Sequence, residues 1–132
     1  MADRQLIEIV PTFVVADVDV SIAHYVDKLG FRTNGVWHND DAVAVFAIVA
    51  RDGARLMLAR TDRGAAAPNK ASREVWDAYV YVTDVAALES EFRANGAEIA
   101  RGPEDTFYDC REIDVTDPDG FVVCFAQDLD PD

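Results

Sequence analysis

The sequence predicts an α+β fold that is built from two similar units in tandem. Residues 13–18 run into a helical pattern, and this unit ends with a turn and a strand near residues 51–58. Residues 79–85 and 117–125 repeat the same order of elements in the second half. A supersecondary unit of this kind cannot bury its apolar face alone, so we expect the two units to face each other across a cleft. The 132 residues suffice for one domain with a single core.

The first unit reads as a strand, a helix and three further strands. Leu6 to Val15 is apolar and β-branched, and Pro11 within it indicates an edge strand or a bulge. The apolar spacing that follows is typical of a helix over about residues 19–29, with Asp17 or Asp19 as its N-cap. Three strands are then expected at residues 31–37, 42–50 and 54–60, joined by a polar turn at 38–41 and an Asp-Gly turn at 51–53.

The second unit repeats this order. A strand is expected at residues 75–83, and Asp84 is placed to cap a helix that ends at Asn95-Gly96. Shorter strands are expected at residues 97–101, 110–116 and 121–127, with a loop at 102–109. The resulting single domain covers residues 1–132, with module one at about 5–60, a linker at about 61–74 and module two at about 75–128.

Composition and charge narrow the function. The chain has 25 acidic and 12 basic residues, a formal net charge of -13, which disfavours nucleic acid as a partner because binding there depends on Lys and Arg. The acids would favour a cationic ligand if they gather at a cleft, whereas a uniform spread would only aid solubility. No apolar run approaches the length of a membrane span, and the N-terminus has no signal-peptide layout, so we expect a cytoplasmic protein. Cys110 and Cys124 are then expected to be reduced thiols, and their spacing fits no zinc motif.

Three groups of residues carry a resemblance to a known superfamily. They are Val15-Ala16-Asp17-Val18 with Ser21, Tyr25 and Leu29-Gly30-Phe31; Val82-Thr83-Asp84-Val85 with Leu88; and Arg111-Glu112-Ile113 before Asp117-Pro118-Asp119-Gly120. In this order they resemble the vicinal oxygen chelate superfamily, which holds glyoxalase I, extradiol dioxygenases and bleomycin-resistance proteins. The resemblance implies two βαβββ modules whose sheets curl into an open, barrel-like cup, commonly in a homodimer in which modules from different chains can share a cup.

The resemblance also implies where a metal would bind. In the metal-using members the ligands come from the first and last strand of each module, and these places correspond here to Val10, Met57, Asp77 and Cys124. A valine and a methionine are poor ligands, and a catalytic zinc needs three protein ligands, so we expect no metal centre and no cofactor. Cys124 is better interpreted as a small buried residue than as a nucleophile, because no base can be placed beside it.

The expected cup keeps an aromatic and polar lining, as small-molecule sites do. Because side chains alternate along a strand, Asp77, Tyr79 and Tyr81 should share one face, which we place toward the cup. Phe46 and one of the two tyrosines are expected to pack in the core. The full set of candidate ligand-binding residues is Trp37, Phe46, Trp76, Asp77, Tyr79, Tyr81, Phe107, Tyr108 and Cys124.

The first functional hypothesis is metal-free binding of a small planar or cationic molecule. It follows the bleomycin-resistance branch of the superfamily, whose members bind a cationic drug at a dimer interface without chemistry. The alternative is an enzyme of the glyoxalase or dioxygenase type, a lyase, isomerase or oxygenase, with an unusual metal site or with Asp77 as its base. A third possibility is an accessory subunit that uses the cup for a partner.

Overall fold

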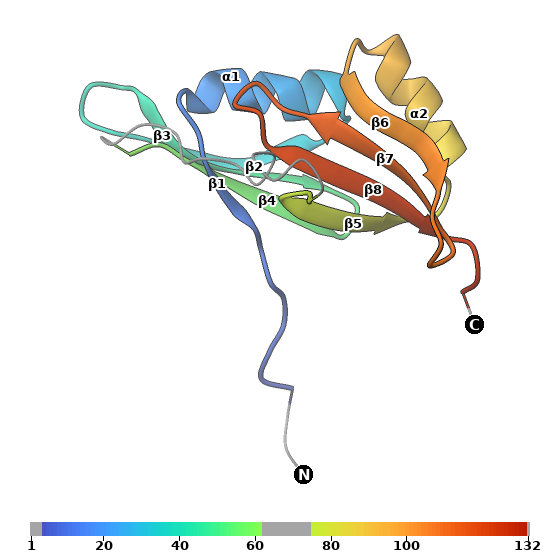
Figure 1. The fold of residues 1–132 in the computed structure, drawn as a ribbon. Coiled ribbons are helices and arrows are strands. Elements are labelled where there is room, and N and C mark those ends of the chain that lie inside the picture. Colours follow the sequence, from blue (N-terminus) through green and yellow to red (C-terminus); the bar gives the residue numbers. More distant parts are fainter. Residues whose placement is uncertain (1–3, 62–74, 132) are drawn as a thin grey trace.

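The computed structural model describes residues 4–61 and 75–131, and it consists of two four-stranded sheets that each carry helical structure (Figure 1). The first half contains β1 (Thr12–Val14), α1 (Val18–Ala23), the π-helical turn η1 (His24–Lys28), β2 (Arg32–His38), β3 (Ala44–Arg51) and β4 (Ala54–Ala59). The second half contains β5 (Ala78–Val82), α2 (Val85–Ala94), β6 (Glu98–Asp105), β7 (Cys110–Thr116) and β8 (Val122–Asp128). The predicted α+β fold with two βαβββ units is confirmed, and the two sheets are open rather than closed into a barrel. No helix in the described ranges is long and apolar enough to span a membrane.

The two sheets have the same topology. Their strand orders are β1-β4-β3-β2 and β5-β8-β7-β6, so the first strand of each half lies at a sheet edge, parallel to the last strand. The other neighbours are antiparallel. Thr12 pairs with Met57 in the first sheet, and Tyr79 pairs with Cys124 at the equivalent place in the second.

Both helices begin at an aspartate. The carboxylate of Asp17 accepts a hydrogen bond from the backbone N–H of Val20, at 3.1 Å, and Asp84 does the same for Ala87, at 3.1 Å. These bonds satisfy donors in the first turn that have no partner within the helix. The structure therefore selects Asp17 over Asp19 as the first cap and confirms Asp84 as the second.

One core joins the two halves. The Phe13 and Phe121 rings, one from each half, stack with centroids 4.4 Å apart. The hydroxyl of Tyr25 on η1 donates to Asp117 in the β7–β8 turn at 3.1 Å. Arg51, at the β3–β4 turn of the first half, forms an ion pair with Glu91 on α2 of the second half at 2.7 Å. A helix of each half thus contacts a hairpin turn of the other half.

Several predicted boundaries are wrong. The strand expected over Leu6–Val15 is only three residues long, because Pro11 has no N–H and no strand accompanies residues 6–9. β6 continues to Asp105, so the loop expected at 102–109 is shorter. The first helix changes to π-helical turns at His24. Most of the predicted linker, residues 62–74, lies outside the described residues.

Candidate functional site

A row of polar side chains occupies the face of the second sheet that is turned away from α2. Along β7, Ile113 and Val115 are buried in the core, so Glu112 and Asp114 between them project from the opposite, outer face. Both are acidic, and Glu112 is fully buried although it lies on this outer face. A buried carboxylate must be paired, so its partners define the site.

Three donors surround Glu112. The hydroxyl of Tyr79 on β5 donates to Oε2 at 2.6 Å, and the hydroxyl of Tyr108 in the β6–β7 turn donates to the same oxygen at 2.7 Å. Nη2 of Arg101 on β6 donates to Oε1 at 2.6 Å. Arg101 also donates from Nε to Asp114 Oδ2 at 2.8 Å. We call Glu112, Tyr79, Tyr108, Arg101 and Asp114 the acid site.

Electrostatics fix the protonation of the acid site near neutral pH. Burial raises the pKa of Glu112, but the hydrogen bonds from Tyr79, Tyr108 and Arg101 outweigh it and hold that pKa below its ordinary value. Burial, and then the bond to Glu112, raise the pKa of the Tyr79 phenol. The bond to Glu112 is the main cause that raises the pKa of Tyr108 to about 12. The site therefore holds an ionised carboxylate between two protonated phenols and a guanidinium.

The backbone approaches Glu112 closely at Gly102. This residue has a φ of +93°, and a Cβ atom there would collide with the carbonyl oxygen of Glu112. Only glycine is compatible with both the positive φ and the close contact. The glycine at position 102 thus allows the backbone of β6 to lie close to that of β7, so that Arg101 reaches the carboxylate of Glu112.

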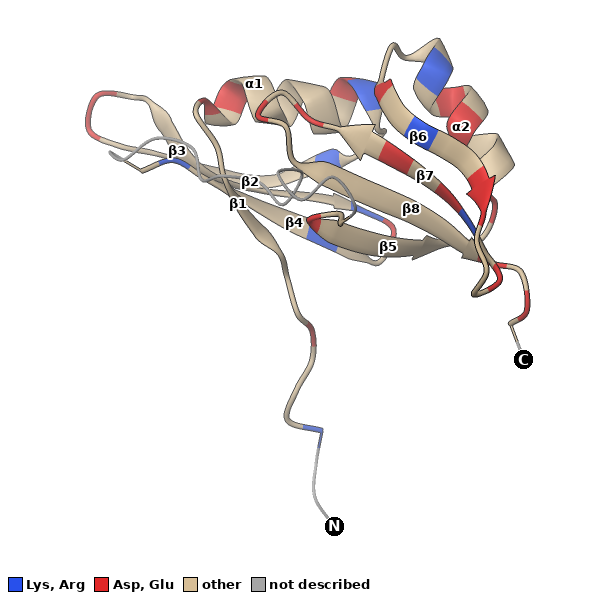
Figure 2. Ribbon diagram, in the orientation of Figure 1, with Lys and Arg blue, Asp and Glu red and all other residues tan. Residues whose placement is uncertain are grey.

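A cavity of about 820 Å³, the outer cavity, opens on this face beside the acid site. Among the described residues, its lining includes one basic side chain, that of Arg101, and the rings of Trp76, Phe107 and Tyr108. Figure 2 shows acidic positions along β7 with one basic position on the neighbouring β6. The five acidic side chains of the lining are Glu98, Glu104, Asp105, Glu112 and Asp114. Such a concave, acidic and aromatic surface favours a cation with a flat apolar part.

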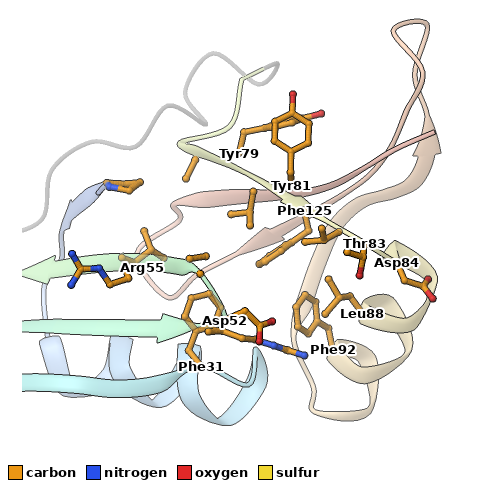
Figure 3. A pocket seen from close by; sticks show the side chains of 18 of the residues that line it. Phe31, Asp52, Arg55, Tyr79, Tyr81, Thr83, Asp84, Leu88, Phe92 and Phe125 are labelled. Atoms are coloured by element: carbon orange, nitrogen blue, oxygen red, sulfur yellow. The ribbon is translucent and has the colours of Figure 1, made fainter. Parts of the chain in front are cut away.

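A second cavity, also of about 820 Å³, lies between the two sheets, and we call it the seam groove (Figure 3). The whole of β5 forms one side of it, and residues 51–56 of the β3–β4 hairpin form another. Phe31, Leu88, Phe92 and Phe125 give the groove an apolar floor.

The structure divides the predicted ligand-binding residues among separate places. Trp76, Phe107 and Tyr108 line the outer cavity. The ring centroid of Trp76 lies 4.7 Å from that of Tyr79. Tyr79 and Tyr81 line the seam groove, with their rings 5.2 Å apart. The ring centroids of Trp37 and Phe46 lie 5.3 Å apart on the first sheet, and neither residue lines a cavity.

Asp77 and Cys124 line neither cavity as well. The Asp77 carboxylate accepts a hydrogen bond from the backbone N–H of Val122 at 2.8 Å, which continues the β5–β8 pairing. Cys124 is fully buried, as expected, and both cysteines are free thiols. The buried carboxylate that Tyr79 contacts in the structure is Glu112, and the second phenol that contacts it is that of Tyr108.

The donors do not fit a metal centre. Strand pairing places Tyr79, not Asp77, beside Cys124, and Thr12, not Val10, beside Met57. Burial raises the pKa of the Cys124 thiol, which disfavours the thiolate that binds metals. Both oxygens of Glu112 already accept hydrogen bonds. Within residues 4–61 and 75–131, no group of three His, Cys, Asp or Glu side chains is arranged to hold a metal ion.

Sequence reasoning missed Glu112, Arg101 and Asp114 as site residues. A signal was present, because Cys110, Glu112 and Asp114 alternate with the apolar Ile113 and Val115 in the predicted strand. Polar residues that alternate with core residues must project from the opposite face. The position of Arg101 had no such signal, since it depends on the pairing of β6 with β7.

Comparisons with known proteins agree with the fold. The family model of the Glyoxalase/Bleomycin resistance protein/Dioxygenase superfamily matches residues 8–125. No curated protein matches the chain. Solved structures that are similar include a bleomycin-binding protein from bleomycin-producing Streptomyces verticillus in complex with copper(II)-bleomycin, with 26% identity, a TM-score of 0.67, and coverage of 93% of this chain and 97% of that one. TnmS3, an antibiotic binding protein from Streptomyces sp. CB03234, is 24% identical with a TM-score of 0.67, covering 95% and 99%. A glyoxalase-related enzyme from Clostridium phytofermentans is 16% identical with a TM-score of 0.71, covering 96% and 98%.

Proposed function

The chain belongs to the Glyoxalase/Bleomycin resistance protein/Dioxygenase superfamily, and from that premise we propose that it binds a small planar, cationic molecule without a metal ion. The single observation that carries the proposal is the lining of the outer cavity, in which, among the described residues, five acidic side chains and one basic side chain lie among aromatic rings. Two of the similar structures are of proteins that bind bleomycin or another antibiotic, which supports the same class of function.

The acid site gives this cavity a fixed negative charge. Glu112 is buried and ionised, and its two phenol partners cannot neutralise it by proton transfer near pH 7, because their pKa values lie above the usual range. Arg101 is shared among Glu112, Asp114 and Glu104, so one positive charge faces three negative ones. A ligand cation at the rim would offset this excess, while the Phe107 ring, which is 96% exposed, offers a face for its rings.

Calorimetric titration with matched probes tests the proposal. Ethidium is a planar cation, phenanthridine is its uncharged parent ring, and bleomycin is a large cationic antibiotic. We expect ethidium or bleomycin to bind at least 10-fold more tightly than phenanthridine, and the difference to shrink in high salt. The proposal is overturned if neither cation binds more tightly than about 1 mM.

A pair of variants locates the binding site. Glu104→Gln removes a rim charge from the outer cavity and should weaken the binding of ethidium several-fold. Glu89→Gln is the matched control, because Glu89 pairs with Arg93 along α2 and lines neither cavity. Equal losses in both variants would place the binding elsewhere.

The enzyme alternative has no comparable support. In its metal-free form it relies on Asp77 as a base, and the Asp77 carboxylate accepts a hydrogen bond from the backbone of Val122 outside both cavities. We also propose that the protein forms the homodimer that the resemblance implies.

A further inference from the structure

The Arg101 guanidinium lies between two carboxylates of the acid site. Its Nε and Nη2 donate to the two oxygens of Asp114, at 2.8 Å and 3.2 Å, and Nη2 also donates to Oε1 of Glu112 at 2.6 Å. A planar guanidinium with parallel N–H donors matches a carboxylate at two points, which a compact ammonium group does not. The acceptor oxygens of Glu112 and Asp114, which we call the guanidinium subsite, are thus arranged for a planar cation with forked donors.

The guanidinium subsite faces the outer cavity. Glu112, Asp114 and Arg101 all belong to the lining of this cavity, and the Arg101 side chain is 30% exposed, so solutes can reach it. The hydroxyls of Tyr79 and Tyr108 donate to Oε2 of Glu112, the oxygen that the guanidinium does not use. These two bonds would hold the carboxylate in place if another planar cation took the position of the guanidinium.

A second partner for the Arg101 side chain lies nearer the solvent. Nη1 of Arg101 is 3.3 Å from Oε2 of Glu104, whose side chain is 57% exposed. β6 is the last strand of its sheet, and its register with β7 shifts on both sides of Arg101. Such shifts disrupt the ladder of backbone hydrogen bonds locally, so this part of β6 is held less firmly than a regular strand. The guanidinium can therefore move away from Glu112 and Asp114 and remain paired with Glu104.

We propose that Arg101 is a built-in competitor for the ligand, and that the ligand carries an amidinium or guanidinium group that displaces the Arg101 guanidinium from Glu112 and Asp114. This inference rests on the proposed function, because it assigns the charged group of the cation that the outer cavity would bind. The exchange replaces one forked cation by another, so the buried charge of Glu112 stays paired. The exposed ring of Phe107 lines the same cavity and is available to the planar part of the ligand.

The exchange determines which cations the protein accepts. An amidinium has N–H donors in the geometry of a guanidinium, whereas a quaternary ammonium carries the same charge and leaves Oε1 of Glu112 without a hydrogen bond. A site built for hydrogen bonds rejects an analogue that lacks the donors. Arg101 also lowers the apparent affinity of any ligand that uses the subsite, because only molecules in which Arg101 has moved away can bind it.

Calorimetric titration with matched naphthalene probes tests the exchange. 2-Naphthamidinium carries a forked cation, and trimethyl(2-naphthyl)ammonium has the same ring and charge without N–H donors. Arg101→Ala should bind 2-naphthamidinium about 10-fold more tightly than the wild type does, and the ammonium probe less than about 3-fold more tightly. Arg101→Lys keeps the charge without the fork, so its gain for the amidinium should be smaller.

Arg111→Ala is the matched control. Arg111 pairs with Asp105 at 2.8 Å, and Asp105 lines the outer cavity, so this variant removes a positive charge near the cavity and leaves the guanidinium subsite intact. It should raise the affinity for both naphthyl cations by the same small factor. An equal gain for both cations in Arg101→Ala, or weaker binding of the amidinium there than in the wild type, would overturn the inference.

A melting experiment tests the subsite even if Arg101→Ala is destabilised. Methylguanidinium at about 10 mM should raise the melting temperature of Arg101→Ala and leave that of the wild type unchanged, while tetramethylammonium should raise neither. Absence of this rescue would also overturn the inference. Failure of ethidium and bleomycin to bind the wild type rejects the proposed function, and the inference with it. Cation binding that is stronger in the wild type than in Arg101→Ala rejects the inference alone.

Discussion

Replacing Glu112 by glutamine is expected to lower the free energy of unfolding by about 3 kcal/mol. The carboxylate accepts from three donors through two oxygens, whereas the amide has one acceptor oxygen and an NH₂ group that itself donates. At least one buried donor then loses its acceptor, which costs about 1–3 kcal/mol, and the remaining bonds lose the contribution of the charge. Domains of this kind unfold with only about 5–15 kcal/mol, so the loss is a large fraction.

Urea denaturation at pH 7, followed by the fluorescence of Trp37 and Trp76, measures this loss. Glu89→Gln is the control, and removal of its exposed pair with Arg93 should cost no more than about 0.5 kcal/mol. The double variant with Tyr79→Phe should show a coupling of about 1–2 kcal/mol, because Tyr79 and Glu112 share a hydrogen bond. A Glu112→Gln protein within about 0.5 kcal/mol of the wild type, or strictly additive single losses, would refute the proposed network.

Two further predictions concern Gly102 and the pH dependence of stability. Gly102→Ala should destabilise by several kcal/mol, because its Cβ meets the carbonyl of Glu112 at a positive φ, whereas Gly53→Ala should change little, because nothing lies within 4 Å of a Cβ there. Equal denaturation midpoints for Gly102→Ala and Gly53→Ala would contradict the close contact between Gly102 and the carbonyl of Glu112. Burial raises the pKa of Asp117 to about 6, so the stability that this group contributes below pH 3.8 is lost as the pH rises to about 6. Burial and Lys28 lower the pKa of His24 to about 4, so its contribution is present above pH 6.5 and is lost as the pH falls toward 4. The two oppose each other, so melting curves of Asp117→Asn should show a larger loss of stability than those of the wild type as the pH falls from 6.5 to 4; an equal loss in both proteins would count against it.

Features that depend on neighbours in sequence could be predicted well. Asp84 caps its helix as expected, and β7 has the predicted bounds. Capping and alternation are set by residues a few positions apart, so the sequence contains the information for them. The first strand was predicted too long, because its apolar residues satisfy a strand pattern whether or not a partner strand lies beside them.

The candidate site differs in its residues from the group that was expected from the sequence. A carboxylate beside two phenols was expected, with Asp77 as the carboxylate, and the structure forms this group around Glu112. Asp77 precedes β5, whereas Glu112 lies on β7, and only the order and register of the strands bring Glu112 to Tyr79. A shift of one residue moves a side chain to the other face of a sheet.

The sequence by itself therefore determined the doubled βαβββ pattern, the helix caps and the acidic, aromatic character of the chain, since each of these follows from local periodicity and composition. The tertiary structure alone decided that Arg101, Glu112 and Tyr79 meet, that Trp37 and Phe46 lie apart from them, and that the aliphatic side chains at positions 6, 7 and 9 are exposed. The physical reason is that contacts between distant strands depend on pairing, register and sheet order, which local patterns restrict without specifying.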